Sequence, residues 1–430
     1  MPERFNIFIW LIVLCTAVFV YAVSFASFSV IENKHDVLAD ADTSEYVFLL
    51  KNFRIDKQIG NPWKVQHRST ADTAQKHKVH HVVYAAVGHA GYEMLAPVYD
   101  FLGWGRNRAV FGVNAIIAGI NIILLAMLLR RNNPNSNTVL PFVLFYCIAL
   151  STWIYSSVPE SWPFSATLVL LFFLLLEKRP LRPMYLGVTI GLIMLNNVYL
   201  AALLILLVFA IARDACNFTY FLRDIVIAGG TAAFAWLGGL TVLSCFDVAF
   251  RPDEFVRYTL WFKQFVYLGL PRTDPYVWKA AITNLFINSF VSNQPDPKLP
   301  MEALQITLST SVMGTVATIA YVAVVCVAFW GFIRSFSDGL RLKGARSLLD
   351  DPSVLPILWC VCMLAVTVML YYASGFLYST IVVPILIVLF CRHLDLKIFW
   401  QRLLFYTTLI VIMSNNIDQI VKFRDALFSM

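Results

Sequence analysis

Apolar stretches close to 20 residues long recur along the whole chain, separated by short polar or charged stretches. A helix of about 20 apolar residues spans the hydrocarbon core of a bilayer, so this pattern predicts an all-α polytopic membrane protein. We expect about eleven transmembrane helices in a single transmembrane domain over residues 1–430. Their expected ranges are 6–30, 108–130, 138–156, 162–178, 184–197, 198–213, 225–248, 308–335, 353–372, 375–391 and 398–414.

The charges of the short loops predict the orientation of these helices. Five loops carry Lys or Arg, and the loops that alternate with them, such as "SSVPES" and "YYASGF", carry none. Since Lys and Arg concentrate in cytoplasmic loops, the N-terminus is expected in the cytoplasm. This topology requires that 79–103 does not span, so we expect an interfacial or re-entrant helix there. Both long polar segments, 31–107 and 251–307, then face outside.

Composition narrows the class of protein further. The chain is 59% hydrophobic and 14% charged, with a net charge of +7. A soluble domain carries about a quarter charged residues, so a large soluble domain is excluded. We find no Lys/Arg-rich tract of the kind that binds nucleic acid, and the charge is explained by topology. The expected location is an integral membrane position, in a plasma, inner or endoplasmic reticulum membrane.

The first outer segment places clustered acids directly after a membrane helix. In "DADTSEYVFLLKNF", Tyr46, Leu49, Leu50 and Phe53 lie on one helical face, which predicts an amphipathic surface helix. Asp42 is a good N-cap there, and Glu45 completes a capping box. A partly desolvated carboxylate at the same position is also a candidate general base. The spacing alone leaves both roles open.

The order of elements in the first 130 residues resembles the GT-C superfamily of integral-membrane glycosyltransferases. A first membrane helix is followed by an acidic D-x-x-x-Y motif, then by the His-led helix "HKVHHVVYAAVGHAGYEMLAPVYDFLGW". The "FLGWGRNR" stretch occupies the place of the family's "fG…R" motif, whereas the family's Pro-Pro after the histidine is replaced by "HHVV". Weaker similarity covers "YSSVPESWPF" and "GFLYSTIVVPIL".

This resemblance implies an inverting transfer of a sugar from a polyprenyl-phosphate donor to an extracytoplasmic acceptor. Asp42 takes the family's general-base role because Tyr46 follows it four residues later, and Asp40 competes for that role. Glu45 and Tyr46 are assigned to substrate binding beside it. No cofactor is implied; a divalent metal is not excluded but nothing indicates one.

Further polar residues are expected to bind substrate at the outer face. His80 and His81 are candidates for hydrogen bonds to the donor phosphate or sugar, or for an interfacial polar cluster. Glu160 in the "SSVPES" turn is a candidate sugar ligand, or an acid at the favourable end of the next helix dipole. Cations in an aromatic-rich, interfacial segment suit a lipid phosphate, or ordinary anchoring to membrane lipid. These cations are Arg251, Arg257, Lys263 and Arg272.

Other function classes remain open from the sequence. A transporter or flippase would show broken or charged helices at mid-membrane and internal symmetry, and no convincing repeat is visible. A non-catalytic scaffold subunit of an assembly would tolerate loss of Asp42, and protein partners are unknown. An acyl- or phosphotransferase acting on lipid is a third alternative. The Gly pairs at 229–230 and 238–239 are expected to mark close helix packing.

Overall fold

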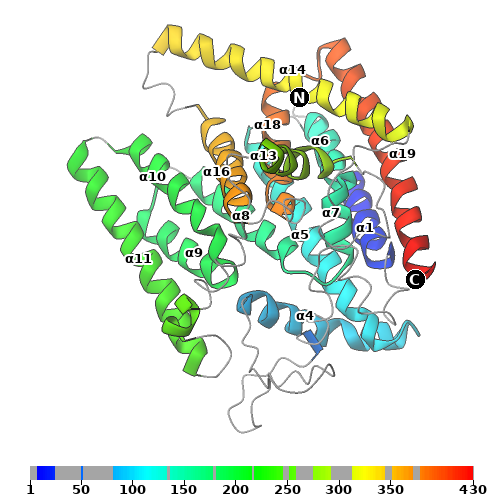
Figure 1. The fold of residues 1–430 in the computed structure, drawn as a ribbon, viewed down its shortest axis with the longest axis horizontal. Helices are drawn as coiled ribbons and strands as arrows, with labels where there is room; N and C mark the ends of the chain where they lie inside the picture. Colours follow the sequence, from blue (N-terminus) through cyan, green and yellow to red (C-terminus); the bar gives the residue numbers. More distant parts are fainter. Residues whose placement is uncertain are drawn as a thin grey trace. The chain divides into compact units, whose positions relative to one another are not determined.

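The computed structural model describes most of the chain and leaves several segments undescribed (Figure 1). The described residues are 7–24, 50–51, 81–132, 136–177, 181–215, 217–245, 251–257, 275–291, 312–343, 351–370 and 378–429.

Every described element is a helix, which confirms the all-α class for this part of the chain. The chain divides into two compact units, the first containing residues 1–44, 111–178 and 270–430 and the second residues 45–110 and 179–269. The first unit contains α1 (Ile7–Ser24), α5 (Ala109–Asn132, from residue 111), α6 (Ser136–Ile148), α7 (Leu150–Ser157), α8 (Trp162–Leu176), α13 (Pro275–Ile282), the π-helix η4 (Thr283–Asn288), α14 (Val312–Lys343), α16 (Val354–Leu370), η7 (Ser379–Ile381), α18 (Val383–His393) and α19 (Phe399–Ser429). The second contains α4 (Val82–Phe101), η2 (Arg106–Arg108), α9 (Pro183–Asn196), η3 (Val198–Ala202), α10 (Leu203–Asp214), α11 (Phe218–Cys245) and a short helix over 252–257.

Each of the eleven expected ranges contains helix, but fewer helices are both long enough and apolar enough to cross a membrane. Among the described residues, three helices are long and apolar enough, namely Ala109–Arg131, Phe218–Cys245 and Val312–Arg341. The pair formed by α6 and α7, bent by 61°, is a fourth if it counts as one span. The other apolar helices have 10–17 residues, short of the roughly 20 that a straight span needs. Eleven spans therefore remain a prediction.

Aromatic side chains from distant parts of the sequence fill the core of the first unit. The ring of Phe145 on α6 lies 5.1 Å from that of Phe290 and 5.3 Å from that of Phe405 on α19. Phe290 also stacks on Tyr321 of α14 at 4.8 Å. The core thus joins α6, α14 and α19 to the segment that follows η4.

Glycines let α9 and α11 approach closely within the second unit, where the two helices lie side by side (Figure 1). A Cβ on Gly191 would overlap the carbonyl of Ala232 and lie 2.7 Å from the Cβ of Ala235. In a bilayer, close backbone approach supplies much of the packing energy between helices. The expectation for the α11 glycines is wrong for Gly229, because a Cβ there would meet no described atom within 4 Å. The same holds for Gly230 and Gly238.

Substituting Gly191 by Ala is expected to destabilise the protein by about 1–3 kcal/mol, because the added methyl must push backbone atoms of α11 apart. Gly229→Ala adds the same methyl on open surface of α11 and should cause no loss, since Ala favours helix over Gly by about 1 kcal/mol. Thermal midpoints of the two variants in one detergent check this. Equal midpoints would contradict the packing described for Gly191.

Candidate functional site

The break between α6 and α7 is buried within the first unit. Ala149 has φ −58° and ψ 132°, which ends the helical hydrogen bonding and turns the chain. The carbonyls freed by the break accept hydrogen bonds from side chains instead. The Tyr21 hydroxyl donates to the Cys147 carbonyl at 2.8 Å, and Asn416 Nδ2 donates to the Ile148 carbonyl at 2.8 Å. Such replacement bonds are what allow irregular backbone at membrane depth.

The segment 275–291 is buried against this break. Leu285 and Phe290 have no exposed surface, and the Ser289 carbonyl accepts the backbone N–H of Ser151 on α7 at 3.1 Å. Asn416 Nδ2 also donates to the Phe290 carbonyl at 2.7 Å. This differs from the expected interfacial helices, because the aromatic and aliphatic side chains here pack into the protein core. Interfacial and core helices are both rich in such residues, so composition does not separate them.

Buried uncharged polar groups lie within the segment 275–291 and beside it on α19. Asn288 donates to Asn284 Oδ1 at 3.1 Å, while Asn284 Nδ2, Ser289 Oγ and Gln419 Oε1 have no hydrogen-bond partner among the described residues. Amides and hydroxyls of this kind bind neutral polar groups but do not titrate near neutral pH. The chemistry that these described groups offer is therefore hydrogen bonding.

The turn between α7 and α8 holds Glu160, whose side chain is buried. Its Oε1 accepts the Ser161 N–H at 2.7 Å and the Ser161 hydroxyl at 3.1 Å. Asn114 of α5 donates from Nδ2 to the carbonyls of Val158 and Glu160, at 2.6 and 2.8 Å. The carboxylate therefore sits at the start of α8, where acids are favoured by the helix dipole. This structural role is present whatever else Glu160 does.

An aromatic pair lies next to this turn. The rings of Trp162, the first residue of α8, and Tyr378, just before η7, meet edge-on with centroids 4.9 Å apart. A second amide of α5, Asn121, donates to the Pro163 carbonyl at 2.8 Å and accepts from Thr167 at 2.6 Å. The start of α8 is thus fixed to α5 by two buried amides, seven residues apart.

His81 immediately precedes α4 in the second unit. Its Nδ1 contacts the carbonyl oxygen of Asn196 at the end of α9, and the side-chain oxygen of Asn196 accepts the Tyr84 N–H at 2.9 Å. A carbonyl only accepts, so Nδ1 carries the proton. Burial lowers the pKa of His81 to about 4, which keeps the ring neutral at pH 7. His81 therefore joins α4 to α9 and is unsuited to supply a positive charge to a phosphate.

Acidification is expected to destabilise the second unit through His81. The unfolded chain binds a proton near the ordinary pKa of 6.5, whereas the folded ring does so only near 4. Stability is therefore full above pH 6.5 and falls by about 3 kcal/mol as the pH drops to 4. Thermal midpoints measured from pH 7 to 4.5 check this. The loss of stability with falling pH should be smaller in His81→Gln. It should be unchanged in the control variant His89→Gln, since His89 also lies on α4 and its Nδ1 also contacts a backbone carbonyl, that of Leu50. Parallel curves for wild type and His81→Gln would contradict it.

The two described arginines of the aromatic-rich segment lie on exposed surface of the second unit. Arg251 forms an ion pair with Glu254 at 3.2 Å and is 63% exposed. Arg257 is exposed and makes no ion pair with a described residue. Phe255 between them packs edge-on against Trp236 of α11 at 5.6 Å. This arrangement is compatible with anchoring at a lipid headgroup and leaves phosphate binding a prediction.

The remaining predicted site residues lie outside the described residues, and their roles stay predictions. These are Asp40, Asp42, Glu45, Tyr46, His80, Lys263 and Arg272. Of the predicted residues that are described, Glu160 belongs to the first unit and His81, Arg251 and Arg257 to the second.

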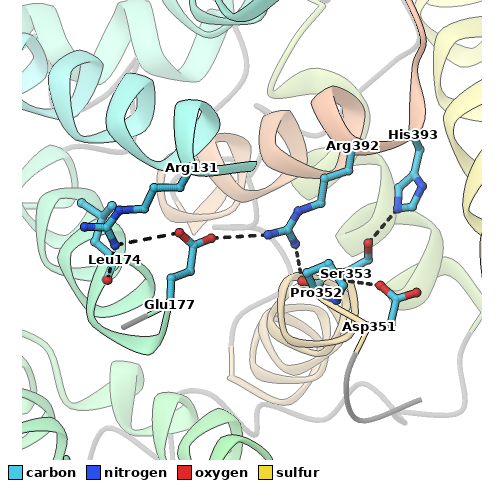
Figure 2. A network of polar contacts seen from close by, with 8 residues as sticks. All are labelled: Arg131, Leu174, Glu177, Asp351, Pro352, Ser353, Arg392 and His393. Carbon is cyan, nitrogen blue, oxygen red and sulfur yellow. Dashed lines mark hydrogen bonds and ion pairs between the residues drawn. The ribbon is translucent and has the colours of Figure 1, made fainter. Parts of the chain in front are cut away.

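A cluster of charged and polar side chains in the first unit was not anticipated from the sequence (Figure 2). Glu177, after α8, lies 3.4 Å from Arg392 of α18 and 3.9 Å from Arg131 of α5. Beside it, Ser353 Oγ and His393 Nε2 lie 2.8 Å apart, and Asp351 accepts the Ser353 N–H at 2.7 Å. The charges can be read in the sequence, but their proximity cannot. Ser353 and His393 are 40 residues apart in the chain, and Glu177 and Arg392 are 215 residues apart.

Among the described residues, no group of three or more His, Cys, Asp or Glu side chains is arranged to hold a metal ion. Comparison with known proteins identifies no relative: no family model, no curated protein and no solved structure matches the chain.

Proposed function

We propose that the protein is an integral-membrane glycosyltransferase that moves a sugar from a polyprenyl-phosphate donor to an extracytoplasmic acceptor. The structural observation that carries the proposal is the turn between α7 and α8, where Glu160 is buried two residues before Trp162, whose ring meets that of Tyr378. A carboxylate accepts the hydroxyls of a sugar strongly, and aromatic rings pack on its C–H faces. The loop charges predict that this turn lies on the same side of the membrane as the acidic motif around Asp42.

The proposed reaction needs a base, a nucleophile and a leaving group. Asp42 removes the proton from the acceptor hydroxyl or amine as that group attacks the anomeric carbon. The new glycosidic bond forms while the bond to the polyprenyl phosphate oxygen breaks, so the configuration inverts. The phosphate leaves with the electron pair, and cations of the 251–272 segment stabilise its charge electrostatically. His81 is not assigned a role in this step, because its neutral ring is bound to Asn196.

The exposed face of α4 supports an interfacial position for this helix. Met94, Val98 and Phe101 recur at helical spacing and are 77%, 49% and 90% exposed. An exposed apolar stripe of this kind is buried when the helix lies in the headgroup region of a bilayer. The acidic motif is expected at the same membrane surface, where a polyprenyl-phosphate headgroup lies.

A second candidate, a solute or lipid transporter, is favoured by one observation. Transporters commonly build their substrate sites from broken helices, and the 61° bend between α6 and α7 is such a break. However, the broken backbone is bonded to Tyr21 and Asn416 and packed by the segment 275–291. The break is filled by protein side chains, which is what a structural kink requires. We therefore rank transport second.

A donor panel tests the proposed function. Purified protein in lipid nanodiscs is incubated with polyprenyl-phosphate sugars, nucleotide sugars and a mixture of hydroxyl and amine acceptors. Transfer is expected from a polyprenyl-phosphate sugar only, with release of polyprenyl phosphate. Transfer from a nucleotide sugar would overturn the donor class. No transfer from any donor, together with solute or lipid movement across the vesicle membrane, would favour the transporter.

A further inference from the structure

An apolar groove runs along α18 in the first unit. It has a volume of about 420 Å³, and its floor is formed by Leu386, Leu389 and Phe390 of α18. Side chains of α14 and α16, which both pack on α18, form its two walls. All lining residues are apolar apart from His393 at one end. A groove of this volume and lining accommodates a hydrocarbon chain rather than a polar ligand.

The groove opens sideways between α14 and α16. Phe329 of α14 and Val361 of α16 line it and are 61% and 55% exposed, so they mark its two rims. α14 is one of the described helices long and apolar enough to span a membrane. In a bilayer this side of α14 faces hydrocarbon, so the molecules that reach the opening are lipid chains.

One end of the groove is closed by protein. Phe286 of the segment 275–291 lines that end, and its carbonyl accepts the Tyr321 hydroxyl at 2.7 Å. Beyond it, Val277, Ala281 and Val368 form a buried apolar cluster. A lipid chain in the groove therefore ends near Phe286, and its polar head lies at the opposite end, beside His393.

The end of the groove at His393 is polar, and α14 carries exposed cations beyond it. Gly331 of α14 lies against the His393 carbonyl, and Phe332 packs edge-on against the His393 ring at 5.5 Å. α14 has 32 residues and is about 48 Å long, so it extends well beyond the roughly 30 Å hydrocarbon core. The part that extends past Phe332 includes Arg334 and Arg341, both exposed and without an ion pair to a described residue. Long basic side chains at headgroup level attract anionic lipid.

We propose that this groove binds one acyl chain of an anionic phospholipid, with the lipid phosphate at the His393 end within reach of Arg334 and Arg341. Because Lys and Arg concentrate on the cytoplasmic side, the end of α14 that carries Arg334 and Arg341 is expected there, and the lipid belongs to the cytoplasmic leaflet. The loop charges predict the donor site on the opposite, outer side of the membrane, so the two proposed sites are distinct. The proposal does not depend on the proposed glycosyl transfer.

Native mass spectrometry of the delipidated full-length protein tests this site. The probes are dioleoyl phosphatidylglycerol, dioleoyl phosphatidylcholine and undecaprenyl phosphate, each titrated in the same detergent. We expect phosphatidylglycerol to bind at least 10-fold more tightly than phosphatidylcholine. Ala328→Phe fills the groove and should abolish the binding of phosphatidylglycerol. Cys326→Phe adds the same ring at an exposed position of α14 outside the groove and should leave that binding unchanged. Arg334→Gln and Arg341→Gln should each weaken binding about 5-fold, and Arg402→Gln on α19 should not.

A rim variant keeps the test informative if Ala328→Phe does not fold. Val361→Trp narrows the opening at an exposed position and should also reduce binding. The proposal would be overturned if phosphatidylglycerol and phosphatidylcholine bound equally tightly. It would also be overturned if the groove variants bound phosphatidylglycerol as tightly as Cys326→Phe does. Preferential binding of undecaprenyl phosphate that Ala328→Phe removes would overturn it as well, since that result would assign the groove to an isoprenoid chain.

Discussion

Replacing Asn416 by Leu is expected to lower the free energy of unfolding by roughly 2–6 kcal/mol, because two buried carbonyls lose their hydrogen-bond donor. Asn416 has no exposed surface, and its Nδ2 donates to the Ile148 carbonyl at 2.8 Å and to the Phe290 carbonyl at 2.7 Å. Both carbonyls lie where the backbone leaves regular helix. Water cannot replace the amide inside a packed core, so each carbonyl bears its full desolvation cost of about 1–3 kcal/mol.

The matched control for this substitution lies on the same helix. Ser414→Leu makes a similar polar-to-apolar change on an exposed face of α19 and should alter stability by less than about 0.5 kcal/mol. Thermal midpoints in detergent, followed by tryptophan fluorescence, compare the two variants with wild type. Tyr21→Phe, which removes the donor to the Cys147 carbonyl, should be intermediate. A midpoint for Asn416→Leu within 2 °C of Ser414→Leu would show that the break does not depend on the amide.

Replacing Asp42 by Asn is expected to reduce glycosyl transfer by about 10²–10⁴-fold, because the amide cannot accept the acceptor's proton. Asn is nearly the same size as Asp and also caps helices well, so the substitution should not disturb the surface helix predicted after Asp42. The substitution therefore separates the base role from the capping role. Asp40→Asn is the matched variant two residues away, and it should retain most of the activity if Asp42 is the base.

Initial rates of the two variants, at equal amounts of folded protein, check this assignment. A large loss in Asp40→Asn with little loss in Asp42→Asn would move the base to Asp40. Full activity in both variants would reject a carboxylate base in this motif altogether.

Periodicity predicted the positions of the helices well, since the hydrophobic pattern reports which residues leave water. The expected ranges 184–197 and 198–213 meet at Asn197, and Asn197 does separate α9 from the helical residues that follow. What periodicity did not show was the break at Ala149. Nothing in "YCIALST" is a strong helix breaker, and the break depends on donors from Tyr21 and Asn416, 128 and 267 residues away from it.

Some features of the candidate site were predicted and others were not, because contacts between distant segments cannot be read from local sequence. Glu160 stood out because an acid between two apolar helices is costly, and the structure does bury it. His81 was expected to bind substrate, but its ring is engaged by Asn196, a residue 115 positions later. The burial of Phe290 and the cluster around Glu177 likewise arise from contacts between distant segments. Local sequence indicates whether a segment forms a helix, but it does not indicate which distant segment that helix contacts.

The most direct test of the account is the anomeric configuration of the first product formed by wild-type protein. A polyprenyl-phosphate sugar of one defined anomer is supplied with an acceptor, and the product is analysed by proton NMR before it can epimerise. Direct displacement assisted by the Asp42 carboxylate predicts a product of the opposite anomeric configuration, with one polyprenyl phosphate released per sugar transferred. A product of retained configuration, or release of polyprenyl phosphate without a glycosylated product, would contradict the proposed mechanism.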